Sequence, residues 1–416
     1  MLDFDDRPYQ FIPPRPNFLA AQLITFLNRI WHLPRRLKID RVQASGALAQ
    51  PYSWPKGARL ILMANHPTHA DAPILLEACR QVGIWPCFMA AYEVFQRGRF
   101  NTRLMQSLGA FSVDRDGFAK QSMECAMSLL RRPPKLGKRR GLTIFPQGNV
   151  YLENDRAGVF LEGAAFLACR AAKELKDTAP VFVIPVAIKA SFSDEAQTRA
   201  AVGERLSRLE NMFGLTAQCA PILDRLSNLG LSALRRNLSQ RGWDCPEAAA
   251  SLKETIQLAA GTVLDDLERK MGVTSKLEQT AAERIRNLRK IIHEIRVDPD
   301  RVADHSAAEV WADHAMIALR ITSYSGDYVS ENPSIDRVAE TVEKLEEDIT
   351  RNLPPVIARR SAFVRFGEPI DVCQSLERHV RVREAAAELC HACQCRVQSM
   401  LDEINAENCN AGRNPF

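Results

Sequence analysis

A histidine and an aspartate five positions apart are the first candidates for chemistry, in the segment Asn65-His66-Pro67-Thr68-His69-Ala70-Asp71. A turn in this segment can fold Asp71 back onto the imidazole of His66. A carboxylate on one ring nitrogen fixes the tautomer and leaves the other nitrogen free to take a proton from a hydroxyl. His69 also lies near Asp71, and Asp71 is well placed to cap a following helix. The segment therefore predicts either a general-base pair or a plain helix cap.

Three further segments carry residue types or turns with possible roles at a site. Gly109–Arg115 ends in an arginine, which can bind phosphate in a bidentate way or form a salt bridge with a nearby acid. Phe145-Pro-Gln-Gly-Asn149 is a turn whose backbone N–H groups can hold an anion or an oxyanion, or an ordinary strand-to-loop turn. Val183-Ile-Pro-Val186 places a proline inside a strand, which indicates a strand edge or a bulge.

The elements that must position these segments alternate between apolar strands and helices. The predicted strands cover 59–64, 111–114, 141–145 and 181–188, and the predicted helices cover 72–82, 118–130 and 163–175. This alternation, with near-continuous apolar strands, indicates an α/β sheet flanked by helices. Each of the four segments lies at the end of a strand or within one.

The rest of the chain has a different pattern. Residues 196–352 show mostly helical periodicity, whereas 362–372 form a strand candidate before a C-terminal helix that ends near residue 405. We predict an α/β fold with a helix-flanked mixed sheet and a large helical insertion before its last strand. The expected divisions are 1–45 (proline-rich arm and amphipathic helix), 46–195 (α/β domain), 196–354 (insertion) and 355–416 (returning strand and C-terminal helix).

A helix predicted for residues 18–31 has one apolar face. That face carries Leu19, Leu23, Phe26, Leu27 and Ile30. The basic residues that follow it are Arg35, Arg36, Lys38 and Arg41. This combination is typical of a helix at a membrane interface, with apolar side chains among acyl chains and arginines on anionic headgroups. The alternative is a helix packed on the core of the protein itself.

Composition limits the class of protein. The 416 residues carry a net charge of +5, which is too small to indicate a nucleic-acid partner. Positive charge is concentrated at 97–140, with eleven basic and three acidic residues, so an anion is best sought there. Eleven cysteines without regular spacing predict reduced thiols in the cytoplasm. The N-terminus is acidic, whereas a secretory signal peptide would begin with basic residues. The chain lacks an apolar run of about 18 residues, so no transmembrane helix is expected.

One cysteine-rich segment resembles a fragment of a metal site. Cys390-His-Ala-Cys393-Gln-Cys395 lies in a helical stretch and has no second cysteine or histidine pair at zinc spacing. We therefore expect reduced cysteines within a helix and no metal.

In their order and spacing, the four segments resemble the motif blocks of the glycerophospholipid acyltransferase family, of the 1-acylglycerol-3-phosphate acyltransferase type. The blocks of that family read Asn-His-x4-Asp, Gly-x4-Asp-Arg, Phe-Pro-Glu-Gly-Thr and Val-x-Pro. Phe160-Leu-Glu-Gly163 is similar to the family's Phe-x-x-Gly, and Phe366-Gly-Glu-Pro-Ile370 is similar to its late strand. The resemblance covers residues 40–190 and 360–372.

The resemblance implies transfer of a fatty acyl group from a thioester of CoA or acyl-carrier protein to a hydroxyl of a glycerolipid. His66 would be the general base and Asp71 would orient it, while Arg115 would clamp the acceptor phosphate. The residues expected to bind substrate are Asn65, Arg115, Gln147, Gly148 and Asn149. The reaction needs no cofactor, because the acyl donor is a co-substrate, and no acyl-enzyme, because a thioester is already activated.

The third block departs from the family pattern. Gln147 replaces glutamate, Asn149 replaces threonine, and Val150 replaces a basic or polar residue. An amide keeps the hydrogen-bonding shape of a carboxylate but cannot act as an anion. The acceptors that stay open are glycerol phosphate, lysophosphatidate, another lysophospholipid and an unrelated lipid alcohol.

Other functions compete with this interpretation. A degenerate member of the family would serve as a lipid-binding scaffold, although the intact His66 and Asp71 argue against decay. A CoA-independent transacylase would exchange acyl chains between phospholipids. A hydrolase would be expected to carry a Gly-x-Ser-x-Gly turn, which we do not find.

The expected partners are a phospholipid membrane surface and acyl-CoA or acyl-carrier protein, with no nucleic acid and an open oligomeric state. We expect a cytoplasmic protein, bound peripherally to the inner face of a membrane.

Overall fold

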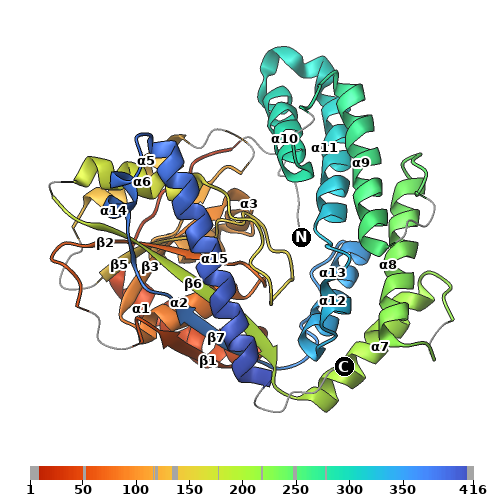
Figure 1. The fold of residues 1–416 in the computed structure, drawn as a ribbon, viewed down its shortest axis with the longest axis horizontal. Coiled ribbons are helices and arrows are strands. Elements are labelled where there is room, and N and C mark those ends of the chain that lie inside the picture. The colour runs from red at the N-terminus through yellow and green to blue at the C-terminus, as the bar shows by residue number, and fades with distance from the viewer. Residues whose placement is uncertain are drawn as a thin grey trace. The chain divides into compact units, whose positions relative to one another are not determined.

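Residues 9–194 and 358–409, far apart in the sequence, build one unit around a sheet, and residues 195–357 build a second unit (Figure 1). The computed structural model describes residues 9–409 except 50–52, 116, 118–119, 134–138, 177, 217–218, 247–250 and 277–278. The first unit contains every predicted site residue, so the fold is described mainly there.

The sheet of the first unit has eight strands in the described residues, in the order β1-β7-β6-β2-β5-β3-β4, with β8 paired to β6. The strands are β1 (Ile39–Gly46), β2 (Arg59–Ala64), β3 (Ile84–Ala91), β4 (Phe111–Val113), β5 (Arg139–Ile144), β6 (Val181–Phe192), β7 (Arg360–Phe366) and β8 (Ile370–Asp371). Neighbouring strands from β6 to β4 are parallel, whereas β7 and β8 run antiparallel to β6. The sheet is therefore mixed, as predicted.

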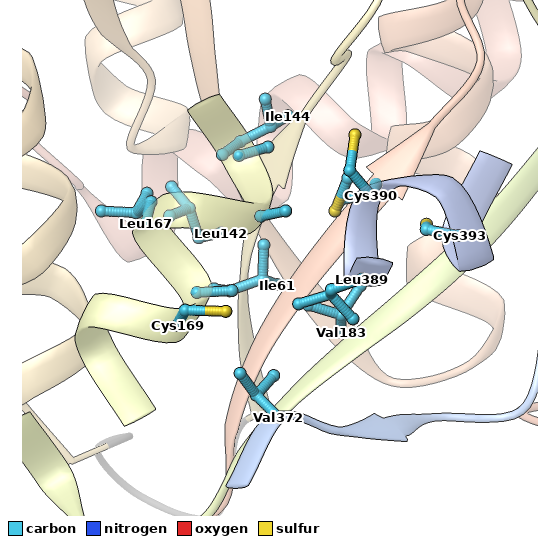
Figure 2. Packing of buried hydrophobic residues seen from close by; sticks show 14 of the residues in the cluster. Ile61, Leu142, Ile144, Leu167, Cys169, Val183, Val372, Leu389, Cys390 and Cys393 are labelled. Carbon is cyan, nitrogen blue, oxygen red and sulfur yellow. The ribbon is translucent and has the colours of Figure 1, made fainter. Parts of the chain in front are cut away.

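Helices cover both faces of this sheet. They are α1 (Phe18–Leu27), the π-helix η1 (Asn28–Arg36), α2 (Asp71–Gln81), α3 (Tyr92–Phe95), α4 (Arg99–Leu108), α5 (Lys120–Arg131), α6 (Gly163–Leu175), α14 (Val372–Glu377) and α15 (Val382–Cys409). Ile61 of β2 faces a core shared with α5, α6 and α15, and Leu62 faces a second core shared with α2. Figure 2 shows Ile61 in the first core, with Leu167 of α6 and Leu389 of α15. Since both faces are covered, every residue of β2 is buried.

The predicted elements match the structure best where one short apolar run is enough to define them. The strand expected at 59–64 is β2 and the helix expected at 163–175 is α6. β1 and β3 were not predicted, and β1 depends on pairing with β7 near the other end of the chain. The single strand expected at 362–372 is wrong in extent. β7 ends at Phe366, where Gly367 and Pro369 interrupt the ladder before β8 and α14.

Two more predicted boundaries shift. The strand expected at 181–188 is β6, which continues to Phe192 because its second half pairs with β7. The helix expected at 118–130 is α5, described from Lys120 onward, and residues 118 and 119 lie outside the described residues.

The second unit is helical, and it confirms the predicted helical insertion between β6 and β7. Its helices are α7 (Glu195–Asn211), α8 (Ile222–Ser239), α9 (Leu252–Met271), α10 (Ala281–Val297), the 3₁₀-helix η2 (Pro299–Asp304), α11 (His305–Thr322), α12 (Tyr328–Glu331) and α13 (Ile335–Thr350). α9, α10 and α11 share a core that includes Leu264, Leu288 and Ala315. Over the described ranges of both units, we find no helix with the length and apolar character needed to span a membrane.

The close packing of the sheet predicts the cost of a small substitution in β5. A Cβ at Gly141 would overlap Leu62 Cδ1 and lie 3.2 Å from Ile84 Cγ2. We expect Gly141→Ala to lower the free energy of unfolding by about 1–3 kcal/mol, because an overfilled core forces side chains to shift. Urea unfolding of the purified protein measures this difference.

Gly163→Ala is the matched control, since a Cβ at this first residue of α6 meets no atom within 4 Å. We expect this variant to be unchanged or more stable by up to about 1 kcal/mol, because alanine restricts the unfolded chain. Equal losses of stability in the two variants would contradict the packing argument.

Candidate active site

The carboxyl ends of parallel strands bring three of the four segments to one end of the sheet. His66 follows β2, Arg115 follows β4, and Gln147 follows β5. Such an edge is the usual position of ligand sites in open α/β sheets. The fourth segment lies inside β6, and β6 is a central strand. Its Pro185 sits between the pairing of Val183 with β8 and that of Val186 with β7, where a missing N–H is tolerated.

His66 and Asp71 form a hydrogen bond of 2.7 Å between Nδ1 and Oδ2. Asp71 is fully buried at the start of α2, and its two oxygens also accept bonds from the N–H of Thr68 at 2.8 Å and the Oγ1 of Thr68 at 2.7 Å. Because the carboxylate accepts each of these bonds, Nδ1 of His66 is the donor. The neutral ring then carries its lone pair on Nε2, and the side chain is 21% exposed.

Aromatic and amide groups hold the imidazole from other sides. The ring of His66 stacks on Phe145, with centroids 4.2 Å apart and an interplanar angle of 19°. Phe145 in turn stacks on Phe88 of β3. The backbone N–H of His66 donates to Oε1 of Gln147. His66 is thus oriented by the residues after β5 as well as by Asp71.

Asn65 lies in the site but points into the protein. Its side chain is fully buried, donating to the carbonyl of Ile188 at 2.9 Å and accepting from the N–H of Ile188 at 2.7 Å. These two bonds continue the β2–β6 ladder by one rung after its last backbone pair. The geometry therefore gives Asn65 a positioning role beside His66, and its predicted contact with substrate has no support from these bonds.

The predicted substrate-binding turn 147–149 is tightly constrained. Gly148 has φ +74°, a conformation that favours glycine, and its N–H donates to the carbonyl of Phe145 at 3.1 Å. Gln147 is buried, and its Nε2 lies so close to Gly158 that a Cβ there would come within 2.5 Å. The amide oxygen of Gln147 thus contacts His66, and its nitrogen lies against Gly158 in the loop after this turn.

Arg115 reaches the same turn from β4. Its Nη1 donates to Oδ1 of Asn149 at 2.6 Å, with a longer contact of 3.4 Å to the carbonyl of Gly148. Its Nη2 donates to Oε1 of Glu93 in α3. The structure therefore joins Arg115 to Gly148 and Asn149, and Gln147 of the same turn to His66.

Sequence reasoning missed Glu93 and a buried ion pair that involves β6. Glu93 follows β3, and neither β3 nor α3 was predicted. Lys189 of β6 pairs with Asp155, and both side chains are almost completely buried. A lysine inside an apolar strand was the available signal, because buried charges are normally paired.

The Cys390–Cys395 segment lies on α15. Cys390 and Cys393 are buried in the first core, and burial raises the pKa of Cys390 to about 11 and raises that of Cys393 as well. Exposed Cys395 lies 3.6 Å from Nε2 of His391. Within the described ranges, no group of three or more His, Cys, Asp or Glu side chains could hold a metal ion.

Comparison with known proteins adds one finding to this geometry. Residues 47–189 match the family model described as Acyltransferase. Searches of curated proteins and of solved structures found no significant match. The matched range runs from the end of β1 into β6 and contains each predicted site residue from Asn65 to Asn149. Residues 47–189 of this protein are therefore similar to the Acyltransferase family.

Proposed function

We propose that the protein transfers a fatty acyl group from a thioester of CoA or acyl-carrier protein to a hydroxyl of a glycerophospholipid precursor. The observation that supports this proposal is the His66–Asp71 pair, with Nδ1 bound to a buried carboxylate and the ring partly exposed. A neutral imidazole held in this tautomer is suited to general-base catalysis.

The proposed reaction needs one base and no covalent intermediate on the protein. Nε2 of His66 takes the proton of the acceptor hydroxyl as the hydroxyl oxygen attacks the carbonyl carbon of the thioester. A C–O bond forms, the C–S bond breaks, and the leaving thiolate takes the proton back from His66. The products are the new ester and a free thiol, and His66 returns to its neutral form.

Asp71 has two tasks in this proposal. It fixes the orientation of the imidazole, and it stabilises the imidazolium that exists while the proton is held. Both Thr68 bonds keep the carboxylate in place when the charge on His66 changes. Gln147 supports the same ring through the backbone of His66.

We expect His66→Ala to abolish transfer, and Asp71→Asn to lower kcat by about 10²–10⁴-fold, because an amide at position 71 no longer enforces the correct tautomer. Radiolabelled acyl-CoA or acyl-carrier protein, offered with a panel of lysophospholipids, measures the product. Asp224→Asn, at an exposed aspartate of α8, is the matched control and should be fully active.

The same assay separates the competing functions. Transfer that survives His66→Ala would contradict the base assignment. Product formed from a phospholipid donor, with none from either thioester, would indicate a transacylase. Lipid binding without transfer from any donor would indicate a scaffold.

We also propose that the protein binds peripherally to the inner face of a membrane through α1 and its neighbours. The exposed apolar residues there are Phe18, Leu19, Leu23, Phe26, Leu27, Ile30, Trp31 and Phe100. Leu19 is 78% exposed and Phe100 of α4 is 81% exposed. An apolar surface of this kind beside exposed arginines suits an anionic bilayer surface.

Two sets of hydrogen bonds connect this apolar surface to the site. Asn28 donates to the carbonyl of Pro73 at 2.9 Å, in the first turn of α2 that begins with Asp71. Asn101 and Thr102 of α4 donate to the carbonyls of Val94 and Phe95, in the helix that carries Glu93. Docking through α1 and Phe100 would therefore bring the start of α2, with Asp71, and α3, with Glu93, close to the lipid surface.

We expect the triple variant Leu19→Ser, Leu23→Ser, Phe26→Ser to bind anionic vesicles at least about tenfold more weakly, because each buried apolar side chain contributes about 1.5–3 kcal/mol. Flotation with phosphatidylglycerol-containing vesicles measures the bound fraction. Val380→Ser, at a fully exposed valine outside this surface, is the control and should bind normally. Undiminished binding by the triple variant would rule out this docking surface.

A further inference from the structure

We infer that the acceptor carries a zwitterionic phosphodiester headgroup and that Glu93 is the residue that selects it. This inference rests on the proposed function, because it concerns the acceptor of the same site. It starts from one observation: Arg115, the side chain expected to bind the acceptor phosphate, is already paired with a carboxylate.

The Arg115–Glu93 pair is partly buried and firmly placed. The two side chains are 20% and 25% exposed. Nη2 of Arg115 donates to Glu93 on α3, while Nη1 donates to Asn149 on the turn after β5. The guanidinium thus links α3 to the turn after β5. A headgroup bound to Arg115 would lie beside both this cation and the Glu93 carboxylate.

The charges of this part of the site cancel. Arg115 supplies one positive charge and Glu93 one negative charge. The adjoining turn adds none, since Gln147 and Asn149 are amides and Val150 is apolar. A phosphate that reaches this turn meets no excess positive charge from these five residues.

Acceptors with different headgroups would respond differently to this pair. A phosphomonoester carries about 1.5–2 negative charges at pH 7, whereas a phosphodiester carries one. The repulsion between Glu93 and a headgroup grows with the negative charge of the headgroup. It is weakly screened, because the charges are a few ångströms apart in a partly buried site. Arg115 attracts a phosphate more strongly as its charge rises, and the repulsion by Glu93 rises in the same way, so the pair gives a lysophosphatidate no advantage over a lysolipid with a phosphodiester.

An ammonium group on the headgroup would turn the same carboxylate into a binding group. The phosphodiester would pair with Arg115 and the ammonium with Glu93, so that charges of opposite sign alternate. Selection would then come from the attraction between the ammonium and Glu93, which a lysophosphatidate lacks. Lysophosphatidylethanolamine is a probe with this chemistry.

The test compares lysophosphatidylethanolamine and lysophosphatidate with the same acyl chain as acceptors. We expect the wild-type protein to prefer the zwitterion by at least about tenfold in kcat/KM, and Glu93→Gln to shift the ratio towards lysophosphatidate by about tenfold. Glu93→Asp keeps the charge and should keep the preference. Glu174→Gln, which breaks the exposed pair with Arg131 elsewhere, should leave the ratio unchanged.

Calorimetric titration with short-chain forms of both lysolipids, below their micelle concentrations, gives the same ratio without turnover. A wild-type preference for lysophosphatidate, or a binding ratio that Glu93→Gln does not change, would overturn the inference. A binding preference that depends on Glu93 in a protein without transferase activity would support the headgroup assignment and refute the proposed reaction.

Discussion

The two hydrogen bonds between the Asn65 side chain and the backbone of Ile188 set the path of the chain as it leaves β2, and the site depends on that path. The backbone ladder between β2 and β6 ends at Ala64, and the amide supplies the next rung. From there the N–H of His66 meets Gln147, and the chain turns into α2 so that Asp71 returns to the imidazole. Because a buried amide and a buried peptide group are both costly to leave unpaired, each strand holds the other in place.

The loop after β5 is held in a similar way, by residues from the far end of the chain. Asn154 pairs with the backbone of Ala190, one residue beyond the ion pair between Lys189 and Asp155. On α15, Gln398 accepts from the N–H of Ala157 at 2.8 Å, although the two residues are 241 positions apart. The returning segment thus supports the loop that carries Gln147, which explains why the first unit needs residues on both sides of the helical unit.

Charged groups around the site are arranged in pairs. Asp71 is paired with His66, Asp155 with Lys189, and Glu93 with Arg115. The first two carboxylates are buried, so their partners are needed to offset the loss of water. In the third pair, both the cation and the carboxylate are partly exposed. It is therefore the one of these three pairs whose carboxylate is in contact with solvent.

The sequence by itself determined the elements and residues defined by short spacing: β2, α6, the turn from His66 to Asp71, and the order of the segments that Arg115 and Gln147 belong to. Apolar runs and motif spacing are local properties, so they can be recognised without knowing the fold. Only the tertiary structure decided the roles of β1, Asn65, Glu93 and Lys189. β1 is held by a strand more than three hundred residues later, and Asn65 is turned inward by a strand more than a hundred residues away. Contacts of this kind depend on which strands become neighbours, and that choice is made by the packing of the whole sheet.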